Sequence, residues 1–211
     1  MTQVVENVLS QRRERTRQRI FEVTFRLIGH EHGLSVRIEE ICAAASISRG
    51  TFYNYFSSMD ELFQTLAVEL THDFNESVIE SCARISGVAE RTSAIVQHYL
   101  RRAQRDAEWA WAMVHLSAAG PIFGAESHRA CYRTISQGLE DGEFRVANAQ
   151  CGRDIIMGSV FAAMRSILSG DGGRVRPQAV AHCLLRGLGL DDAHAKHIAD
   201  TPVPPIRAGR G

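Results

Sequence analysis

Apolar residues recur every three to four positions along nearly the whole chain, and this periodicity is the feature that most limits its possible folds. Such spacing places apolar side chains on one face of an α-helix, whereas the alternation typical of a half-buried strand is short wherever it occurs. No internal repeat accompanies the pattern. The sequence therefore predicts an all-α protein of about nine to ten helices. Beyond the N-terminal third we expect helices at about 88–105, 107–119, 126–141, 152–169, 177–188 and 192–199.

Residues that break helices mark the ends of these segments. Gly120-Pro121 stops one helix and Gly142 another. The stretch SGDGG at 169–173 stops a third, and Pro177 then suits the first turn of the next helix, where its missing N–H costs nothing. The tail at 201–211 holds three prolines and two glycines and has little to bury, so we expect it to be disordered.

The composition argues against several classes of protein. Basic and acidic side chains number 24 each, so the net charge of zero does not by itself indicate a polyanionic partner. The longest apolar-leaning run, at 155–164, is about half of the roughly 20 residues that span a bilayer. The N-terminus also lacks the basic start and apolar stretch of a secretory signal. We therefore expect a cytoplasmic protein with no membrane partner.

Metal sites, cofactors and enzymatic motifs are not expected either. The five cysteines are scattered and include no C-x-x-C pair, and the nine histidines lack the spacing around carboxylates that is typical of a metal site. The chain contains no nucleophile elbow, no phosphate-binding loop and no H-E-x-x-H motif. We therefore predict a protein that is not an enzyme.

The stretch SISRGTFYNYF at 46–56 predicts a short helix with two different faces. Ser48 is a good N-cap, because its hydroxyl can accept a hydrogen bond from a free backbone N–H of the first turn. Ile47 and Phe52 occupy the two positions of a hydrophobic staple, and Phe56 lies on the same side as Phe52. The helix is therefore held along one side and presents the other side outward.

The outward face of this helix suits the major groove of DNA. Ile38 and Ile41 indicate a short preceding helix, and two short helices joined by a turn predict a helix-turn-helix. Arginine binds guanine or phosphate, asparagine pairs with adenine, and the threonine methyl can meet the thymine methyl. Tyrosines near a helix end are also common at the rim of a core, which is the alternative interpretation. The predicted DNA contacts in this segment are Ser48, Arg49, Gly50, Thr51, Tyr53, Asn54 and Tyr55.

Residues 19–66, about a quarter of the chain, resemble the N-terminal DNA-binding domain of the TetR (tetracycline-repressor-like) family of bacterial transcription regulators. The resemblance implies a homodimer whose C-terminal helices bind a ligand and pair with a second subunit. Those later helices carry no motif of their own and agree with the family only in number and order. The residues that carry the resemblance are Ile20, Leu27, Gly33, Ile38, Ile41, Ala45, Ser48, Gly50, Thr51, Tyr53, Phe56 and Leu62.

Three positions depart from the pattern of the family. Arg37 takes the N-cap place usually held by serine or threonine, and either a phosphate contact or plain exposure is open for it. Ser46 replaces a glycine expected in a left-handed turn, at a cost of about 1 kcal/mol. Met59 replaces a frequent phosphate-binding lysine. An arginine-rich run that includes Arg12 and Arg13 is a candidate source of the missing charge, the alternative being a solvated helix face.

The resemblance also implies that helices between about 88 and 141 surround a ligand cavity. Trp109 and Trp111 lie about 200° apart on their predicted helix, so both cannot face the same core. Apolar walls with a few polar tips are typical of small-molecule sites, so we expect a largely apolar effector. Ordinary helix packing is the alternative for each candidate. The candidates are Trp109, Trp111, Met113, His115, Phe123, Tyr132, Met157 and Phe161.

The last two long helices carry apolar stripes that predict the dimer interface. Two such helices from each subunit would form a four-helix bundle, which buries stripes that a single subunit leaves uncovered. The predicted interface residues are Val160, Met164, Ile167, Leu184 and Leu188.

The sequence thus predicts a DNA-binding region at 1–65, a ligand-binding and dimerisation region at 66–200 and a disordered tail at 201–211. We expect a homodimeric transcription regulator, a repressor that leaves its pseudo-palindromic double-stranded operator when a small molecule binds. The alternative is a helical adaptor that binds a protein partner and whose helix-turn-helix no longer reads DNA.

Overall fold

The computed structural model describes residues 2–118, 125–170 and 175–206, and every regular element in these ranges is a helix. The prediction of an all-α protein is therefore confirmed. None of the described helices combines the length and apolar character that crossing a membrane requires. The elements are α1 (Thr2–Ile28), the 3-10 helix η1 (Gly33–Ser35), α2 (Ile38–Ala45), α3 (Arg49–Tyr53), α4 (Met59–Cys82), α5 (Val88–Arg105), α6 (Ala107–Ala118), α7 (Ala125–Glu140), α8 (Ala149–Leu168), α9 (Pro177–Gly187) and α10 (Asp192–Asp200).

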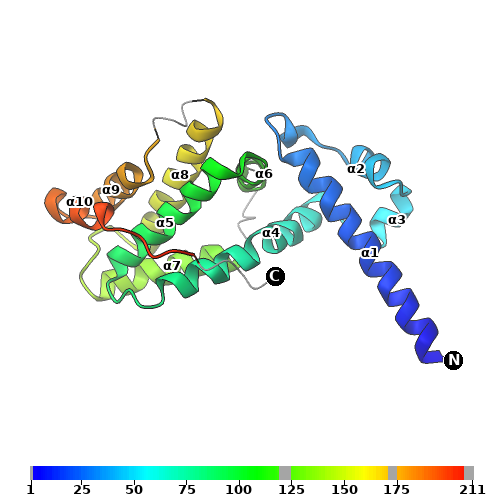
Figure 1. The fold of residues 1–211 in the computed structure, drawn as a ribbon, viewed down its shortest axis with the longest axis horizontal. Helices are drawn as coiled ribbons and strands as arrows, with labels where there is room; N and C mark the ends of the chain where they lie inside the picture. The colour runs from blue at the N-terminus through cyan, green and yellow to red at the C-terminus, as the bar shows by residue number, and fades with distance from the viewer. Residues whose placement is uncertain (1, 119–124, 171–174, 207–211) are drawn as a thin grey trace.

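The helices form two groups joined by α4 (Figure 1). α1, α2 and α3 lie at one end of the molecule, and α5 and α7 to α10 lie at the other, with α6 beside α1. α4 is continuous through position 65, where the sequence predicted a boundary. Leu62 and Leu66 near its start are buried, and so are Val78 and Cys82 near its end. One helix is therefore part of both groups.

α1 begins at Thr2 and extends well beyond the helices it packs against (Figure 1). Its second half is amphipathic, with Ile20, Val23 and Ile28 buried. Thr24 is also buried, and its hydroxyl donates to the Ile20 carbonyl at 2.7 Å. The arginine-rich run is thus part of a continuous helix that carries its charges away from the core.

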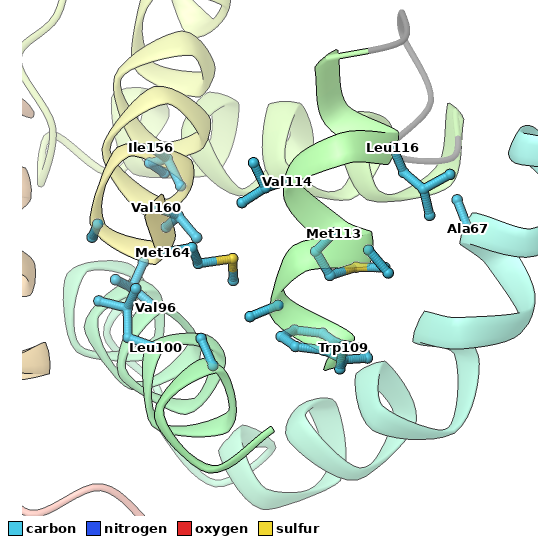
Figure 2. Close-up of a cluster of buried hydrophobic side chains, with 14 of the residues drawn as sticks. Ala67, Val96, Leu100, Trp109, Met113, Val114, Leu116, Ile156, Val160 and Met164 are labelled. Carbon is cyan, nitrogen blue, oxygen red and sulfur yellow. The ribbon is translucent and has the colours of Figure 1, made fainter. Parts of the chain in front are cut away.

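α6 lies between α1 and the other helices of the larger group (Figure 1). Its side chains meet α4, α5 and α8 on different sides, as Figure 2 shows for Trp109, Met113, Val114 and Leu116. All four are at most 4% exposed. A helix that is apolar all round belongs in an interior, because it has no face that would gain from contact with water. This position of α6 explains the two tryptophans on different sides of one helix.

The first part of the predicted disordered tail is ordered against the body. Val203 and Ile206 pack on a small cluster formed by Val78, Cys82 and Ala94 of α4 and α5. The prediction is therefore wrong for residues 201–206, because the two apolar side chains among the prolines find a surface that the sequence did not show. Residues 207–211 lie outside the described ranges.

Candidate nucleic-acid interface and interior cavity

Ser46 forms the turn between α2 and α3 in a left-handed conformation. Its φ and ψ are 55° and 47°, and among the described residues it alone has a positive φ without being glycine. The Ser46 N–H donates to the Ala43 carbonyl at 3.1 Å, and the Ile47 N–H donates to the Cys42 carbonyl at 3.0 Å. Arg19 of α1 donates to the Ser46 hydroxyl at 3.4 Å. The structure therefore has the left-handed turn with serine in place of glycine.

Ser46→Gly is expected to raise the free energy of unfolding by about 0.5–1 kcal/mol, because glycine adopts a left-handed backbone without a steric cost. Thermal unfolding should show a rise in Tm of about 2–4 °C. Ser77→Gly is the matched control, since Ser77 lies inside α4 and glycine lowers the stability of a helix there. A lower Tm for Ser46→Gly would show that the turn depends on the serine hydroxyl instead.

The start of α3 and its attachment to the core follow the pattern predicted from the sequence. The Ser48 hydroxyl accepts a hydrogen bond from the Thr51 N–H at 3.0 Å, which confirms Ser48 as the N-cap. Phe52 and Phe56 are 0% and 3% exposed. Their rings are 5.9 Å apart, and Phe56 lies 5.6 Å from Phe21 of α1. Aromatic packing against α1 therefore fixes the direction in which α3 faces outward.

The opposite side of α3 is open to solvent. Ser48, Arg49, Gly50, Tyr53 and Asn54 are exposed, and Thr51 and Tyr55 are half-buried. The structure thus brings the seven predicted contacts of this segment onto one short helix and its ends. Their contact with DNA stays a prediction.

Arg49 already has a partner in the free protein. Its Nη1 lies 2.7 Å from Glu39 Oε1 of α2, and both side chains are more than half exposed. Exposed ion pairs of this kind contribute only about 0–1 kcal/mol, so the guanidinium can exchange Glu39 for a phosphate or a guanine at small cost.

Arg37 stands at the N-cap of α2 with an extended backbone, φ −112° and ψ 158°. A guanidinium has no hydrogen-bond acceptor, so its side chain cannot cap the helix. Glu40 closes the first turn instead, because its Oε2 accepts from the Arg37 N–H at 2.8 Å. The Arg37 side chain is 77% exposed. Its Nε lies 3.7 Å from Glu40 Oε2, and because an exposed ion pair of this kind contributes little, the guanidinium can exchange Glu40 for a phosphate. That phosphate contact stays a prediction.

Basic side chains of α1 lie close to the exposed part of α3. Arg12 and Arg13 are exposed, and the Arg13 guanidinium lies 5.9 Å from the centre of the Tyr55 ring. Met59, which stands where the family often has lysine, is partly buried and packs on the core. At this surface Arg13 of α1 therefore adds to the positive charge of Arg37 and Arg49, whereas the start of α4 contributes none.

A second site is a cavity of about 350 Å³ between α4, α5, α7 and α8. α4 contributes residues at helical spacing from Val68 to Ile79, and α5 contributes the single face that runs from Thr92 to Tyr99. The walls are mainly apolar. Their members are Val68, Thr71, His72, Asn75, Glu76, Val78, Ile79, Thr92, Ile95, Val96, Tyr99, Ala130, Cys131, Arg133, Thr134, Ile156, Met157, Val160 and Phe161.

Most polar groups in the cavity wall are already paired. The hydroxyls of Thr71 and Thr134 donate to carbonyls of their own helices, at 2.8 Å and 3.0 Å. The Tyr99 hydroxyl donates to Asn75 Oδ1. Thr92 differs, because its Oγ1 is buried and has no hydrogen-bond partner among the described residues.

The interior of the cavity carries no ionised side chain. Burial raises the pKa of the Tyr99 hydroxyl above its usual value. Burial also raises the pKa of the Cys131 thiol to about 11. Both groups are therefore neutral at pH 7. The imidazole, carboxylate and guanidinium groups of the wall, on His72, Glu76 and Arg133, belong to exposed side chains.

Only part of the predicted pocket lies at this cavity. Met157 and Phe161 line it. Trp109 and Met113 are buried in the core around α6, and Trp111 and His115 stack on each other at 5.3 Å, so none of these four lines it. Tyr132 is 47% exposed and is also absent from the wall. Phe123 lies outside the described residues.

The tryptophans of α6 do not mark this cavity, because Trp109 is buried among other helices and Trp111 stacks on His115. The Trp109 Nε1–H donates to the Leu70 carbonyl at 3.4 Å, and the ring packs 5.6 Å from Phe74 and 6.0 Å from Tyr99. The wall residues of α4 and α5 were missed. Polar residues at helical spacing on an otherwise apolar face, such as Thr71, Asn75 and Thr92, are the signal that could have indicated them.

The predicted dimer interface is also corrected by the structure. Val160, Met164, Leu184 and Leu188 are at most 8% exposed within the single chain, and Ile167 packs partly buried on the same core. α5 and α6 cover the stripe of α8, and α5 and α10 cover the stripe of α9, although the sequence predicted both stripes to be open. Val160, Met164, Leu184 and Leu188 are therefore not available to a second subunit, whereas a contact of the partly buried Ile167 stays a prediction.

The outer faces of α8 and α9 are lined by small side chains. Gly158 and Ala162 are exposed on the side of α8 opposite Val160, and Ala179, Cys183 and Gly187 are exposed on α9. A Cβ placed on Gly158 would meet no atom within 4 Å. A neighbouring helix could approach this surface closely, and we call it the small-residue face.

α6 also contacts the end of α1. His115 Nδ1 lies 2.8 Å from the Ile28 carbonyl, where α1 ends, and this hydrogen bond is buried. A side chain at Gly29 would collide with Glu108 of α6. The two helix groups are therefore in direct contact through α1 and α6 as well as through α4.

Two family models match the chain in the same two regions. The model described as "Tetracyclin repressor-like, C-terminal domain" matches residues 88–201, which is more than half of the 211 residues. The model described as "Bacterial regulatory proteins, tetR family" matches residues 20–66. The second match contains α2, α3 and the start of α4, and the first contains α5 to α10.

Individual relatives agree with these matches. The HTH-type transcriptional regulator BetI from Agrobacterium fabrum (strain C58 / ATCC 33970) is 30% identical over 80 residues, which are 38% of this chain and 39% of that protein. The chain thus matches less than half of the length of that curated relative. RolR in complex with resorcinol is 29% identical, with a TM-score of 0.74, over 94% of this chain and 100% of that chain.

RolR without ligand is 28% identical, with a TM-score of 0.71, over 90% of this chain and 100% of that chain. AibR in complex with isovaleryl coenzyme A and operator DNA has a TM-score of 0.55 over 82% of this chain and 97% of that chain. Its identity is 19%, so it shows a shared fold alone.

Proposed function

The chain belongs to the TetR family of bacterial transcription regulators, and on that premise we propose that it is a homodimeric repressor that a small molecule releases from its operator. Two subunits would present two α3 helices to the half-sites of a pseudo-palindromic, double-stranded operator. The family is one of transcription regulators and not of enzymes. The adaptor alternative gains no support from Met59, because that side chain packs on the core.

The observation that carries this proposal is that α4 belongs both to the cavity and to the DNA-binding end. Seven of its residues line the cavity, and its first turn begins six residues after the end of α3. A ligand that binds between α4, α5, α7 and α8 would bias the position of α4 and therefore the separation of the two α3 helices. A coupling free energy of about 1–3 kcal/mol would change operator affinity by roughly 5- to 150-fold.

Side-chain contacts through α6 offer a second connection between the cavity and the DNA-binding end. Val160 lines the cavity, and Met164, one turn further along α8, points toward α6 on the side of Val114 (Figure 2). α6 in turn holds the end of α1 through His115 and Ile28. RolR, at 29% identity, has been solved with and without resorcinol, which supports a small-molecule effector for this chain.

The proposal is tested by binding of the purified protein to the intergenic DNA beside its own gene. Fluorescence anisotropy should show saturable binding that unrelated competitor DNA does not remove, and a candidate effector should weaken it. If no genomic fragment is retained above non-specific affinity, the proposal fails.

Tyr53→Ala and Arg13→Ala are expected to weaken DNA binding in different ways. Tyr53 lies exposed on α3, so its loss should weaken operator binding by about 1–3 kcal/mol with less effect on unrelated DNA. Arg13 is a candidate phosphate contact, so its loss should weaken binding to all sequences and reduce the salt slope by about one. Titrations at several salt concentrations measure both effects. Arg105→Ala, at the far end of α5, is the control.

A further inference from the structure

We propose that the cavity takes a neutral, single-ring molecule that carries a hydroxyl, a phenol in chemical class, and that Thr92 Oγ1 pairs with that hydroxyl. This inference rests on the proposed function, in which the cavity between α4, α5, α7 and α8 is the effector site. It assigns the chemistry of the ligand and the residue that selects it.

Thr92 carries an unpaired hydroxyl in the cavity wall. Thr92 is 3% exposed and lines the cavity, and its Oγ1 has no partner among the described residues. A buried hydroxyl without a hydrogen bond lowers stability, so nearly all such groups in native proteins are paired. A helical threonine can bond to a carbonyl of its own helix, as Thr71 and Thr134 do. Thr92 instead lines the cavity with neither the donor nor the acceptor of its hydroxyl engaged by a described residue.

The polar groups of the cavity wall determine which ligand charge is favourable. The polar groups of the interior are hydroxyls, an amide and a thiol, and burial keeps both Tyr99 and Cys131 in their neutral forms by raising the pKa of each. The imidazole, carboxylate and guanidinium groups of the wall belong to exposed side chains, and His72 Nε2 and Glu76 Oε1 already lie 3.7 Å apart. Arg102 and Arg153 act on Tyr99 and Cys131 from outside the wall. A charged group inside would therefore lose its water without a counter-charge in direct contact, which is strongly unfavourable. The buried part of the ligand is therefore neutral.

The volume and the walls of the cavity limit the size and shape of the ligand. A cavity of about 350 Å³ is near the lower end of the range for small-molecule sites, about 300–1,000 Å³. The walls offer the ring of Phe161, the thioether of Met157 and the branched side chains of Ile156 and Val160. Aromatic and thioether groups pack well on the face and edge of an aromatic ring. A single ring with one or two hydroxyls fits this combination of walls and polar groups.

The test is a cycle of two matched changes, one in the ligand and one in the protein. Phenol and toluene differ by a hydroxyl against a methyl, and Thr92→Val makes the same exchange in the wall. Calorimetric titration of the full-length protein should show that the native chain prefers phenol over toluene. That preference should fall about tenfold in Thr92→Val, since the two hydroxyls then no longer pair. Thr92→Ser keeps the hydroxyl and should retain most of the preference.

Thr134→Val is the control in the same wall, because its hydroxyl is bonded to Ala130 and not offered to a ligand. It should retain the preference for phenol far better than Thr92→Val. Benzoate, which keeps the ring but carries a charge, should bind at least about tenfold more weakly than phenol.

Three results would overturn the inference: tighter binding of benzoate than of phenol, no binding of any of the three rings at millimolar concentration, or a preference that Thr92→Val leaves within twofold. These titrations contain no DNA. Phenol binding without any effect on operator binding would therefore contradict the proposed function alone, and operator release by a charged effector would contradict this inference alone.

Discussion

Phe52→Ala is expected to lower the free energy of unfolding of the DNA-binding end by about 3–5 kcal/mol, as large-to-small changes of buried phenylalanine do. Phe52 is 0% exposed and touches the rings of both Tyr53 and Phe56, at 5.6 Å and 5.9 Å. α3 has five residues and cannot persist as a helix without tertiary packing. Operator binding should therefore be lost together with the local stability.

Urea unfolding and operator titration measure these two effects on the same protein. Tyr53→Ala is the matched control, because it removes the neighbouring ring from the solvent side and should leave the unfolding midpoint nearly unchanged. If Phe52→Ala keeps native operator affinity, the aromatic packing beneath α3 does not fix its orientation.

We propose that the two subunits of the dimer pair through the small-residue face, and Ala162→Glu is then expected to give a folded monomer. Ala162 is exposed at the centre of the small-residue face of α8, so a glutamate there costs little within one subunit. Across a two-fold interface it would bury two like charges against each other, which is strongly unfavourable. Operator affinity should fall by at least about a hundredfold, because each subunit then binds a half-site alone.

Light scattering and circular dichroism separate this result from unfolding. Leu184→Glu is the contrasting variant, because Leu184 is 2% exposed in the core of the single chain. It should lose the folded state and not only the dimer, since a buried charge without a partner costs several kcal/mol. A dimer that survives Ala162→Glu would show that the subunits pair through another surface.

Local features of the fold were predictable because neighbouring residues decide them. The N-cap at Ser48, the breaks at Gly142 and Pro177 and the helical spans depend on side chains within a few positions, and the structure has all of them. The left-handed turn at Ser46 was also expected, through the family resemblance. The sequence likewise indicated which side of α3 packs inward, since Phe52 and Phe56 share a face.

The residues that line the cavity and those that form the outer surface could not be predicted from neighbouring residues in the sequence. An apolar stripe on α8 or α9 must be buried, but periodicity does not say whether a helix of the same chain or of a second chain covers it. The answer depended on where α5 and α6 pack, and they cover Val160 and Leu184 within the subunit. The position of Trp109 was not predictable for the same reason, because only the packing of α4 and α5 on α6 shows that its ring is buried.

The sequence by itself determined the helices, their caps and breaks, and the two faces of the segment at 46–56, since these follow from hydrogen bonds and side-chain spacing over one or two turns. Only the tertiary structure decided which residues line the cavity, which face of α8 is left open and how the segment at 201–206 is held. Those outcomes depend on contacts between helices far apart in the chain. A buried hydroxyl without a partner, such as that of Thr92, can be recognised only after every neighbour is in place.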